Sequence, residues 1–108
     1  MRRSDVYFAN LDPRIGSEAD KVRPCVIVSN DANNRRAPTV TVVPITSNVK
    51  RVYPFEVLIE RELERPCKAQ ANQVRTISKL RLADAPIGSL MDDTMQLVDA
   101  ALRLHLRL

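Results

Sequence analysis

The sequence predicts a mainly β protein with a minor α part: a small, strongly bent sheet or barrel with a terminal helix covering one open side. Three observations predict it. Five short strand patterns precede the terminal helical pattern, one of them is almost entirely β-branched, and the terminal pattern begins only at Asp92. With 108 residues, 44% of them hydrophobic, we expect a single domain over residues 1–108.

The first three strands follow from their apolar patterns. Val6–Leu11 alternates between two faces and ends at an Asp-Pro turn pair. Pro24–Ser29 is a nearly continuous apolar run, which is typical of a strand buried on both faces, and the polar residues 30–38 are expected to be connecting chain. Thr39–Ile45 is β-branched almost throughout, which disfavours a helix because branching at Cβ restricts χ1.

Two more strands follow. Phe55–Ile59 alternates, and Cys67–Ala71 places Lys68 and Gln70 on one face and small apolar residues on the other. Residues 73–82 are mixed, and we expect a short helix or turn at residues 74–78 and then another strand.

The terminal helix is predicted from Asp92 onward, because two aspartates favour its first turn and apolar residues recur at helical spacing. The expected apolar stripe comprises Met95, Leu97, Val98, Ala101, Leu102 and Leu104.

Charge and cysteine content say little about function. The formal charge of +4 and a pI near 9.5 favour polyanionic partners, but an excess this small also serves solubility. No apolar run approaches the roughly 20 residues of a membrane helix, and the N-terminus lacks a signal-peptide core, so we expect a cytoplasmic protein. Cys25 and Cys67 have no CxxC partner and no nearby histidine, and we interpret both as small core residues.

Two motifs at strand ends suit phosphate binding. Arg23-Pro24 enters one predicted strand, and Thr46-Ser47 follows the exit of another. A guanidinium donates to two phosphate oxygens at once, and a hydroxyl can donate to a third. Each motif alone also has a structural explanation, since an arginine beside an edge proline and a hydroxyl in a turn are both common.

In order and spacing these motifs resemble the MazF/PemK family of toxin endoribonucleases. The family wording is close to G-S-E-Q-x-G-x-R-P, then an apolar strand ending in S-N or S-P, then P-[ILVC]-T-[ST]. The matching residues are Gly16, Ser17, Glu18, Arg23, Pro24, Ser29, Asn30, Pro44, Thr46 and Ser47. Residues 53–57 match Y-P-F-E-V, residues 71–75 resemble A-D-Q-[IV]-[RK], and Ile87-Gly88 with the terminal helix extends the match along nearly the whole chain.

The resemblance implies an SH3-like barrel with a C-terminal helix and a homodimeric, metal-independent mRNA interferase. Such an enzyme cuts single-stranded RNA at a short sequence, leaves a 2′,3′-cyclic phosphate and a 5′-hydroxyl, needs no cofactor, and is inhibited by a cognate antitoxin.

The residue chemistry narrows the catalytic roles. Attack by the 2′-hydroxyl requires a proton acceptor, stabilisation of the charged phosphorane and a proton for the leaving 5′-oxygen. The chain has one histidine, His105, so a histidine pair within one subunit is excluded. Arg23 suits charge stabilisation and leaving-group protonation, and Thr46 can donate to a non-bridging oxygen. Glu18 is the only motif carboxylate able to accept a proton or orient the 2′-hydroxyl, and the general base stays open.

Further residues are expected to bind RNA: Ser17, Lys21, Ser47, Tyr53, Gln73 and Arg75. Lys21 replaces the second glycine of the family's first loop, which stiffens the loop and adds a charge. The aromatic side chains available to stack on a base are Tyr7, Phe8, Tyr53 and Phe55. Tyr53 or Phe55 is the candidate, and a core position is expected for Phe55. Gln73 and Arg75 either line the RNA groove or fix a strand-to-turn corner by hydrogen bonds.

Two alternatives remain at the level of sequence. One is a non-catalytic small-barrel module that binds RNA or protein. The other is a gyrase poison of the CcdB type, which shares the fold but depends on a C-terminal Trp-Gly-Ile; this chain ends in Leu106-Arg107-Leu108 and has no Trp.

Overall fold

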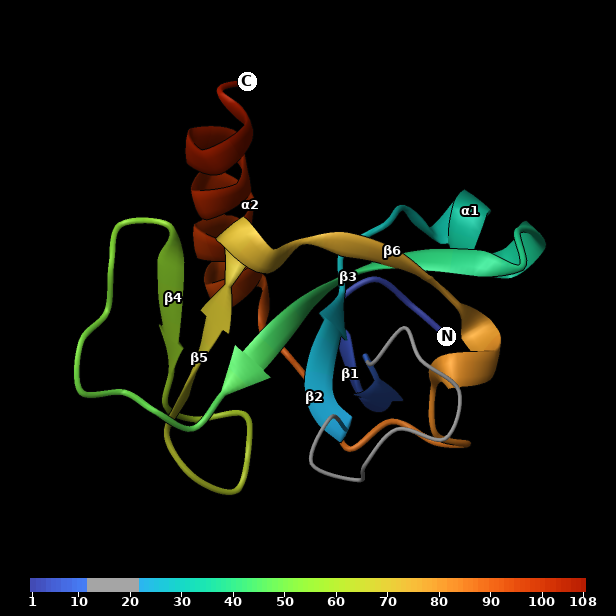
Figure 1. Ribbon diagram of the computed structural model, residues 1–108, viewed down its shortest axis with the longest axis horizontal. Helices are drawn as coiled ribbons and strands as arrows, with labels where there is room; N and C mark the ends of the chain where they lie inside the picture. The colour runs from blue at the N-terminus through green and yellow to red at the C-terminus, as the bar shows by residue number, and fades with distance from the viewer. Residues whose placement is uncertain (12–21) are drawn as a thin grey trace.

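The computed structural model describes residues 1–11 and 22–108, and its strands form one bent antiparallel sheet (Figure 1). The order across the sheet is β4-β5-β3-β2-β1-β7, and β6 pairs with β3 beside this path. The strands are β1 (Asp5–Asn10), β2 (Val22–Ile27), β3 (Thr39–Thr46), β4 (Glu56–Ile59), β5 (Cys67–Gln70), β6 (Arg75–Ser78) and β7 (Gly88–Ser89). The helical elements are α1 (Asp31–Arg36), α2 (Asp92–Leu106) and the 3₁₀ turns η2 (Ala71–Gln73) and η3 (Lys79–Arg81). The predicted mainly β fold with a C-terminal helix is confirmed.

The strand β3 is the centre of the sheet and is paired along both edges. One edge pairs with β2, while the other pairs with β6 over Thr39–Val42 and with β5 over Ile45–Thr46. Between these two ladders Val43 and Pro44 have no strand partner on that edge among residues 1–11 and 22–108, and η2 carries the chain from β5 to β6. A proline has no N–H to donate to a ladder, so this position suits an interruption of the sheet.

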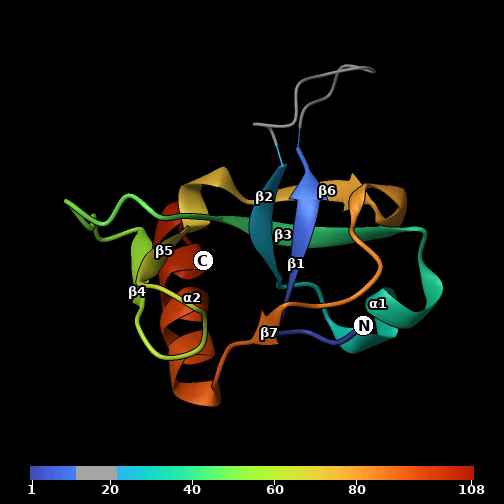
Figure 2. The same ribbon diagram turned by 90° about the horizontal axis from the view of Figure 1, so that it is seen from below.

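Two buried clusters fill the two faces of the sheet, and α2 covers one of them beside β4 and η2 (Figure 2). Val26 belongs to the cluster under α2, whereas its neighbours Cys25 and Ile27 belong to the other. The prediction that this strand is buried on both faces is therefore confirmed. Cys25 and Cys67 are free and buried, as expected for small core residues.

The helix α2 confirms only part of the predicted apolar stripe. Met95, Val98 and Ala101 are buried against the sheet, but Leu97 and Leu104 are 59% and 58% exposed. Hydrophobicity alone therefore overestimated the width of the buried face. None of the helices in residues 1–11 and 22–108 has the length and apolar character needed to cross a bilayer.

The expectation of plain connecting chain over residues 30–38 is wrong, because α1 lies there. This helix has six residues and one buried side chain, Asn34, so it lacks the apolar period on which the prediction depended. Its start is fixed by capping: the Asn30 side chain accepts a hydrogen bond from the Asn33 N–H at 2.9 Å. The Asn34 amide donates to the Ser29 carbonyl at 2.8 Å and ties the helix to the end of β2.

The order of elements predicted after residue 73 is also wrong. Residues 75–78 form the strand β6, and the short helical turns lie on either side of it, η2 before and η3 after. The ladder with β3 decides this, since it pairs Val40 with Ile77 and buries both side chains.

Replacing Met95 by Ala is expected to lower the free energy of unfolding by about 2–5 kcal/mol, because this nearly buried side chain fills the space between α2 and the sheet. Gln96→Ala, one residue along on the exposed face, should change it by no more than about 0.5 kcal/mol. Urea unfolding followed by circular dichroism measures both variants. Equal losses would show that α2 does not pack as described.

Candidate active site

The sheet register brings Arg23 and Thr46 to the same end of two neighbouring strands. Cys25 and Pro44 form the last pair in the ladder of β2 and β3, and Arg23 and Thr46 each lie two residues beyond that pair, on the same face as Cys25 and Pro44 because side chains alternate along a strand. Thr46 in turn pairs with Lys68 on β5. Cross-strand partners share a face of the sheet. Three polar side chains from distant parts of the sequence therefore form one row on one face.

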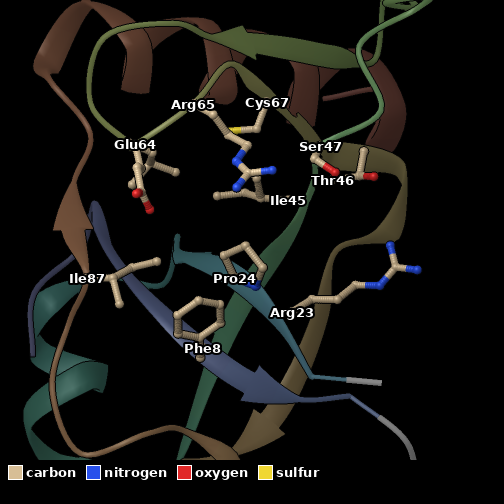
Figure 3. Close-up of a pocket in the computed structure, with 11 residues that line it drawn as sticks. Phe8, Arg23, Pro24, Ile45, Thr46, Ser47, Glu64, Arg65, Cys67 and Ile87 are labelled. Atoms are coloured by element: carbon tan, nitrogen blue, oxygen red, sulfur yellow. The ribbon is translucent and has the colours of Figure 1, made fainter. Parts of the chain in front are cut away.

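A pocket of about 600 Å³ opens beside this row, and Arg23, Thr46 and Ser47 line it together. Figure 3 shows the Arg23 and Thr46 side chains on the same side of the pocket, with Ser47 next to Thr46. The remaining lining residues are Phe8, Pro24, Ile45, Leu63, Glu64, Arg65, Cys67 and Ile87. The pocket thus has an apolar floor and a polar rim that carries two guanidiniums, two hydroxyls and the Glu64 carboxylate.

A second, more polar pocket of about 330 Å³ also includes Arg23. It brings Arg23 together with Gln70, Gln73 and Arg75, and with Leu11 and Pro44. The Arg75 Nη1 donates to the Leu11 carbonyl at 2.8 Å, which fixes the direction of its guanidinium. Arg75 therefore lines a pocket and also holds the chain at the end of β1. Two guanidiniums with two amides suit an anion.

The Thr46 hydroxyl takes part in the turn that follows β3. Its Oγ1 accepts a hydrogen bond from the Asn48 N–H at 3.3 Å, so the structural explanation for a hydroxyl at this position is realised. A hydroxyl has one proton to donate besides its lone pairs. Thr46 can therefore hold the turn through its lone pair while its proton points to a ligand.

Beyond Thr46 in the same row lies a buried ion pair. The Lys68 Nζ donates to the Glu56 Oε1 at 3.0 Å, and the two side chains are only 8% and 3% exposed. Burial opposes ionisation of Glu56, but hydrogen bonds from the Tyr53 N–H, Lys68 and Gln70 outweigh it and lower the pKa of the carboxyl. The alternation of β5 predicted the face of Lys68 correctly and contained no sign of its burial.

Comparison with known proteins identifies the family. Residues 2–106 match the family described as PemK-like, MazF-like toxin of type II toxin-antitoxin system. The chain belongs to this family. It is 46% identical over 116 residues to Endoribonuclease MazF9 of Mycobacterium tuberculosis (strain ATCC 25618 / H37Rv), covering 100% of this chain and 98% of the relative. It is 41% identical over 112 residues to Endoribonuclease EndoA of Bacillus subtilis (strain 168), covering 100% and 96%.

The fold of the toxin is also that of solved relatives. A structure described as an endoribonuclease in complex with its cognate antitoxin, from Mycobacterial species, superposes with a TM-score of 0.84 at 28% identity and covers 100% of this chain and 96% of that one. The predicted MazF/PemK resemblance and fold class are confirmed by these matches.

Tyr53 lies on the β3–β4 connection of the toxin, outside the residues that line the two pockets described above. Its ring stacks on Phe55 with centroids 5.5 Å apart and planes 6° from parallel. The Arg51 Nη1 donates to the Tyr53 hydroxyl oxygen at 3.3 Å. Because Tyr53 is 43% exposed, this aromatic pair is accessible to a ligand.

Three predicted site residues, Ser17, Glu18 and Lys21, lie outside the described residues. His105 is exposed near the end of α2. Within the part of the chain that the structure describes, no group of three or more His, Cys, Asp or Glu side chains could hold a metal ion.

Sequence reasoning missed several of the lining residues. Gln70 was assigned only to a strand face, because nothing in an alternating pattern shows which face opens onto a pocket. Glu64 and Arg65 lie between β4 and β5 in a segment without a motif, and their place at the rim depends on how that connection folds back.

Replacing Glu56 by Gln is expected to lower the free energy of unfolding at neutral pH by about 3–5 kcal/mol, because it leaves the buried Lys68 ammonium without a charged partner. The pKa of Glu56 is lowered by folding, so its contribution is present above the ordinary carboxyl pKa and is lost as pH falls through the lower folded value. The difference in the free energy of unfolding between the parent and Glu56→Gln should therefore narrow as pH falls below the ordinary carboxyl pKa and through the lower folded pKa.

Urea unfolding at a series of pH values tests this. The pH dependence of the parent's free energy of unfolding cannot by itself be assigned to Glu56, since folding also lowers the pKa of Asp31, Glu62 and Asp93. Asp93→Asn, which breaks the exposed pair with Arg61, serves as the control and should change the free energy of unfolding much less. If the difference in the free energy of unfolding between the parent and Glu56→Gln stayed constant as pH fell, the stabilising role of ionised Glu56 would be contradicted.

Proposed function

We propose that this toxin is a sequence-specific, metal-independent endoribonuclease that cuts single-stranded RNA through attack of the 2′-hydroxyl. The observation that carries the proposal is the convergence of Arg23 and Thr46, 23 residues apart in the sequence, on one face and one pocket. The broader class of activity, an endoribonuclease toxin, is confirmed by the family and by the full-length relatives. The roles of individual residues are our proposal.

In the proposed reaction the 2′-oxygen bonds to phosphorus, the bond from phosphorus to the 5′-oxygen breaks, and the products are a 2′,3′-cyclic phosphate and a 5′-hydroxyl. Arg23 donates to the non-bridging oxygens and supplies a proton to the leaving 5′-oxygen, while Thr46 donates to a non-bridging oxygen. Glu18 is our candidate to accept the proton of the 2′-hydroxyl. In this proposal one carboxylate accepts the proton, and no histidine takes part.

The pocket that Arg23 shares with Gln73 and Arg75 is proposed to hold the phosphate next to the scissile one. It adjoins the catalytic row through Arg23 itself, and a second guanidinium there compensates the charge of a further phosphate. Ser17, Lys21 and Ser47 are proposed to contact the RNA backbone around the cut, and Tyr53 to stack on a base.

We further propose that the toxin is a homodimer that acts in the cytoplasm and is inhibited by a cognate antitoxin. The mycobacterial relative was solved with its own antitoxin, which supports a partner of this kind. A chain with a net charge of +4 suits a partner whose inhibitory segment is acidic and folds as it binds.

Arg23→Ala is expected to lower the rate of RNA cleavage by at least about 10³-fold, and Thr46→Val by about 10²-fold, because each removes a donor to the developing charge. Cleavage by the parent should persist in EDTA. The substrate is a long mixed-sequence RNA, and sequencing of the fragment ends gives the cleavage site and the end chemistry. Arg36→Ala, the same change on the exposed face of α1, is the matched control and should cut like the parent.

The outcomes separate the alternatives. Discrete fragments in EDTA with a 2′,3′-cyclic phosphate support the nuclease, whereas RNA that is bound but stays intact favours a binding module. Cleavage by Arg23→Ala at the parental rate would overturn the role of Arg23.

A further inference from the structure

We propose that Lys68 and Glu56 are positioning residues for RNA recognition, whose buried ion pair fixes the β3–β4 connection so that Tyr53 and Arg51 present a preformed surface to a nucleobase beside the cut. The inference rests on the proposed function, because it assigns a specificity role within the same site.

The ion pair holds the connection at two backbone points. The Lys68 Nζ donates to the Arg51 carbonyl at 2.6 Å, and the Glu56 Oε1 accepts from the Tyr53 N–H at 3.0 Å. The same Oε1 accepts from the Lys68 Nζ at 3.0 Å, so one carboxylate oxygen joins both contacts. The backbone on either side of residue 52 is thus tied to the floor beneath it by charged groups, which form the stronger hydrogen bonds.

What this clamp positions is an exposed aromatic and cationic surface. Tyr53 is stacked on Phe55 at 5.5 Å and is 43% exposed. The Lys68 Nζ lies 5.9 Å and the Arg51 guanidinium carbon 5.7 Å from the centre of the Tyr53 ring. A ring stacked on an aromatic neighbour and close to two cations is already restrained, so it loses little freedom when a base packs against its exposed part.

The clamp is adjacent to the catalytic row. Lys68 is the direct cross-strand partner of Thr46, so the two side chains leave the same face of neighbouring strands. Gln70 extends the network in the other direction: its Nε2 donates to the Glu56 Oε2 at 3.3 Å, and it lines the polar pocket with Arg23 and Arg75. The surface formed by Tyr53 and Arg51 is thereby connected to both proposed phosphate sites, through Lys68 to the row with Thr46 and through Gln70 to the polar pocket.

The chemistry of the pair argues for positioning over simple stability. A buried ion pair is often no more stabilising than an apolar pair of similar size. An apolar pair, however, could not bond the Arg51 carbonyl or the Tyr53 N–H. Loss of the charges would therefore leave the core filled while releasing the connection that carries Tyr53.

The test uses two variants. Lys68→Met removes the ammonium, and the double variant Glu56→Leu/Lys68→Met removes both charges and so leaves no unpaired carboxylate. The substrate is a short RNA carrying the site mapped for the parent, and the binding probe is the same RNA with a 2′-deoxy nucleotide at the cut. For either variant we expect KM and the probe Kd to rise about tenfold, within the range of base stacking on an aromatic ring, and kcat to change less than about twofold. Preference for one base beside the cut should relax.

A mutant cycle isolates the mechanism. Tyr53→Ala should raise KM as much as Lys68→Met does, and Tyr53→Ala with Lys68→Met should be no worse than Tyr53→Ala alone. Arg61→Met, which removes the exposed pair with Asp93, is the matched control and should leave KM and base preference unchanged.

The outcomes are distinct. If the parent cuts RNA and Arg23→Ala does not, but folded Lys68→Met keeps the parental KM and base preference, the positioning role is overturned and the nuclease stands. Additive effects of Tyr53→Ala and Lys68→Met would also overturn it, as would failure of both charge-removing variants to fold, since the pair would then be structural. A parent that neither cuts nor binds RNA would overturn both proposals.

Discussion

The antiparallel register around β3 is the constraint on which the rest of the structure depends. Because β3 pairs with β2 on one edge and with β5 on the other, the two ladders decide what surrounds Thr46. The β5 ladder sets Lys68 opposite Thr46, and the β2 ladder ends two residues before Thr46 and Arg23, which brings both to the same end of the sheet. A slip of one residue in either ladder would turn the neighbouring side chain to the opposite face of the sheet and take the row apart.

The same strand explains why the site lies where it does. Most of β3 is buried on both faces under the two core clusters, so its middle cannot bind a ligand. At Val43 and Pro44 the ladder on one edge is interrupted, and η2 moves the chain aside. Polar groups of η2 and its flanks, among them Gln70 and Arg75, line a pocket there with Arg23 at the start of β2. The pockets form where the regular sheet stops.

The sequence was most informative where one physical pattern dominates. The β-branched run of β3, the continuous apolar run of β2 and the helical period of α2 are strong local signals, and each predicted its element to within a few residues. Arg23 and Thr46 could be proposed as a pair because their motifs stand at the ends of two such strands. The pocket that they share could then be anticipated without knowledge of its other walls.

The sequence could not predict what depends on tertiary context. The helix α1 is fixed by capping and by the buried Asn34, with no apolar stripe to reveal it. The order of η2 and β6 is decided by pairing with a strand more than thirty residues earlier. Burial of Lys68 depends on the β3–β4 connection folding over it, and an alternating strand pattern assigns a lysine to a face without saying what covers that face.

Buried charge next to a proposed phosphate site also has an electrostatic consequence. Lys68 adds positive charge beside Thr46, but Glu56 neutralises it at 3.0 Å, so the pair as a whole contributes little net field to the row. In the proposed site the attraction for the RNA backbone therefore comes from the arginines that line the two pockets, Arg23, Arg65 and Arg75. In our proposal the buried pair holds the β3–β4 connection with charged hydrogen bonds, while the pocket arginines supply the charge that meets the phosphate.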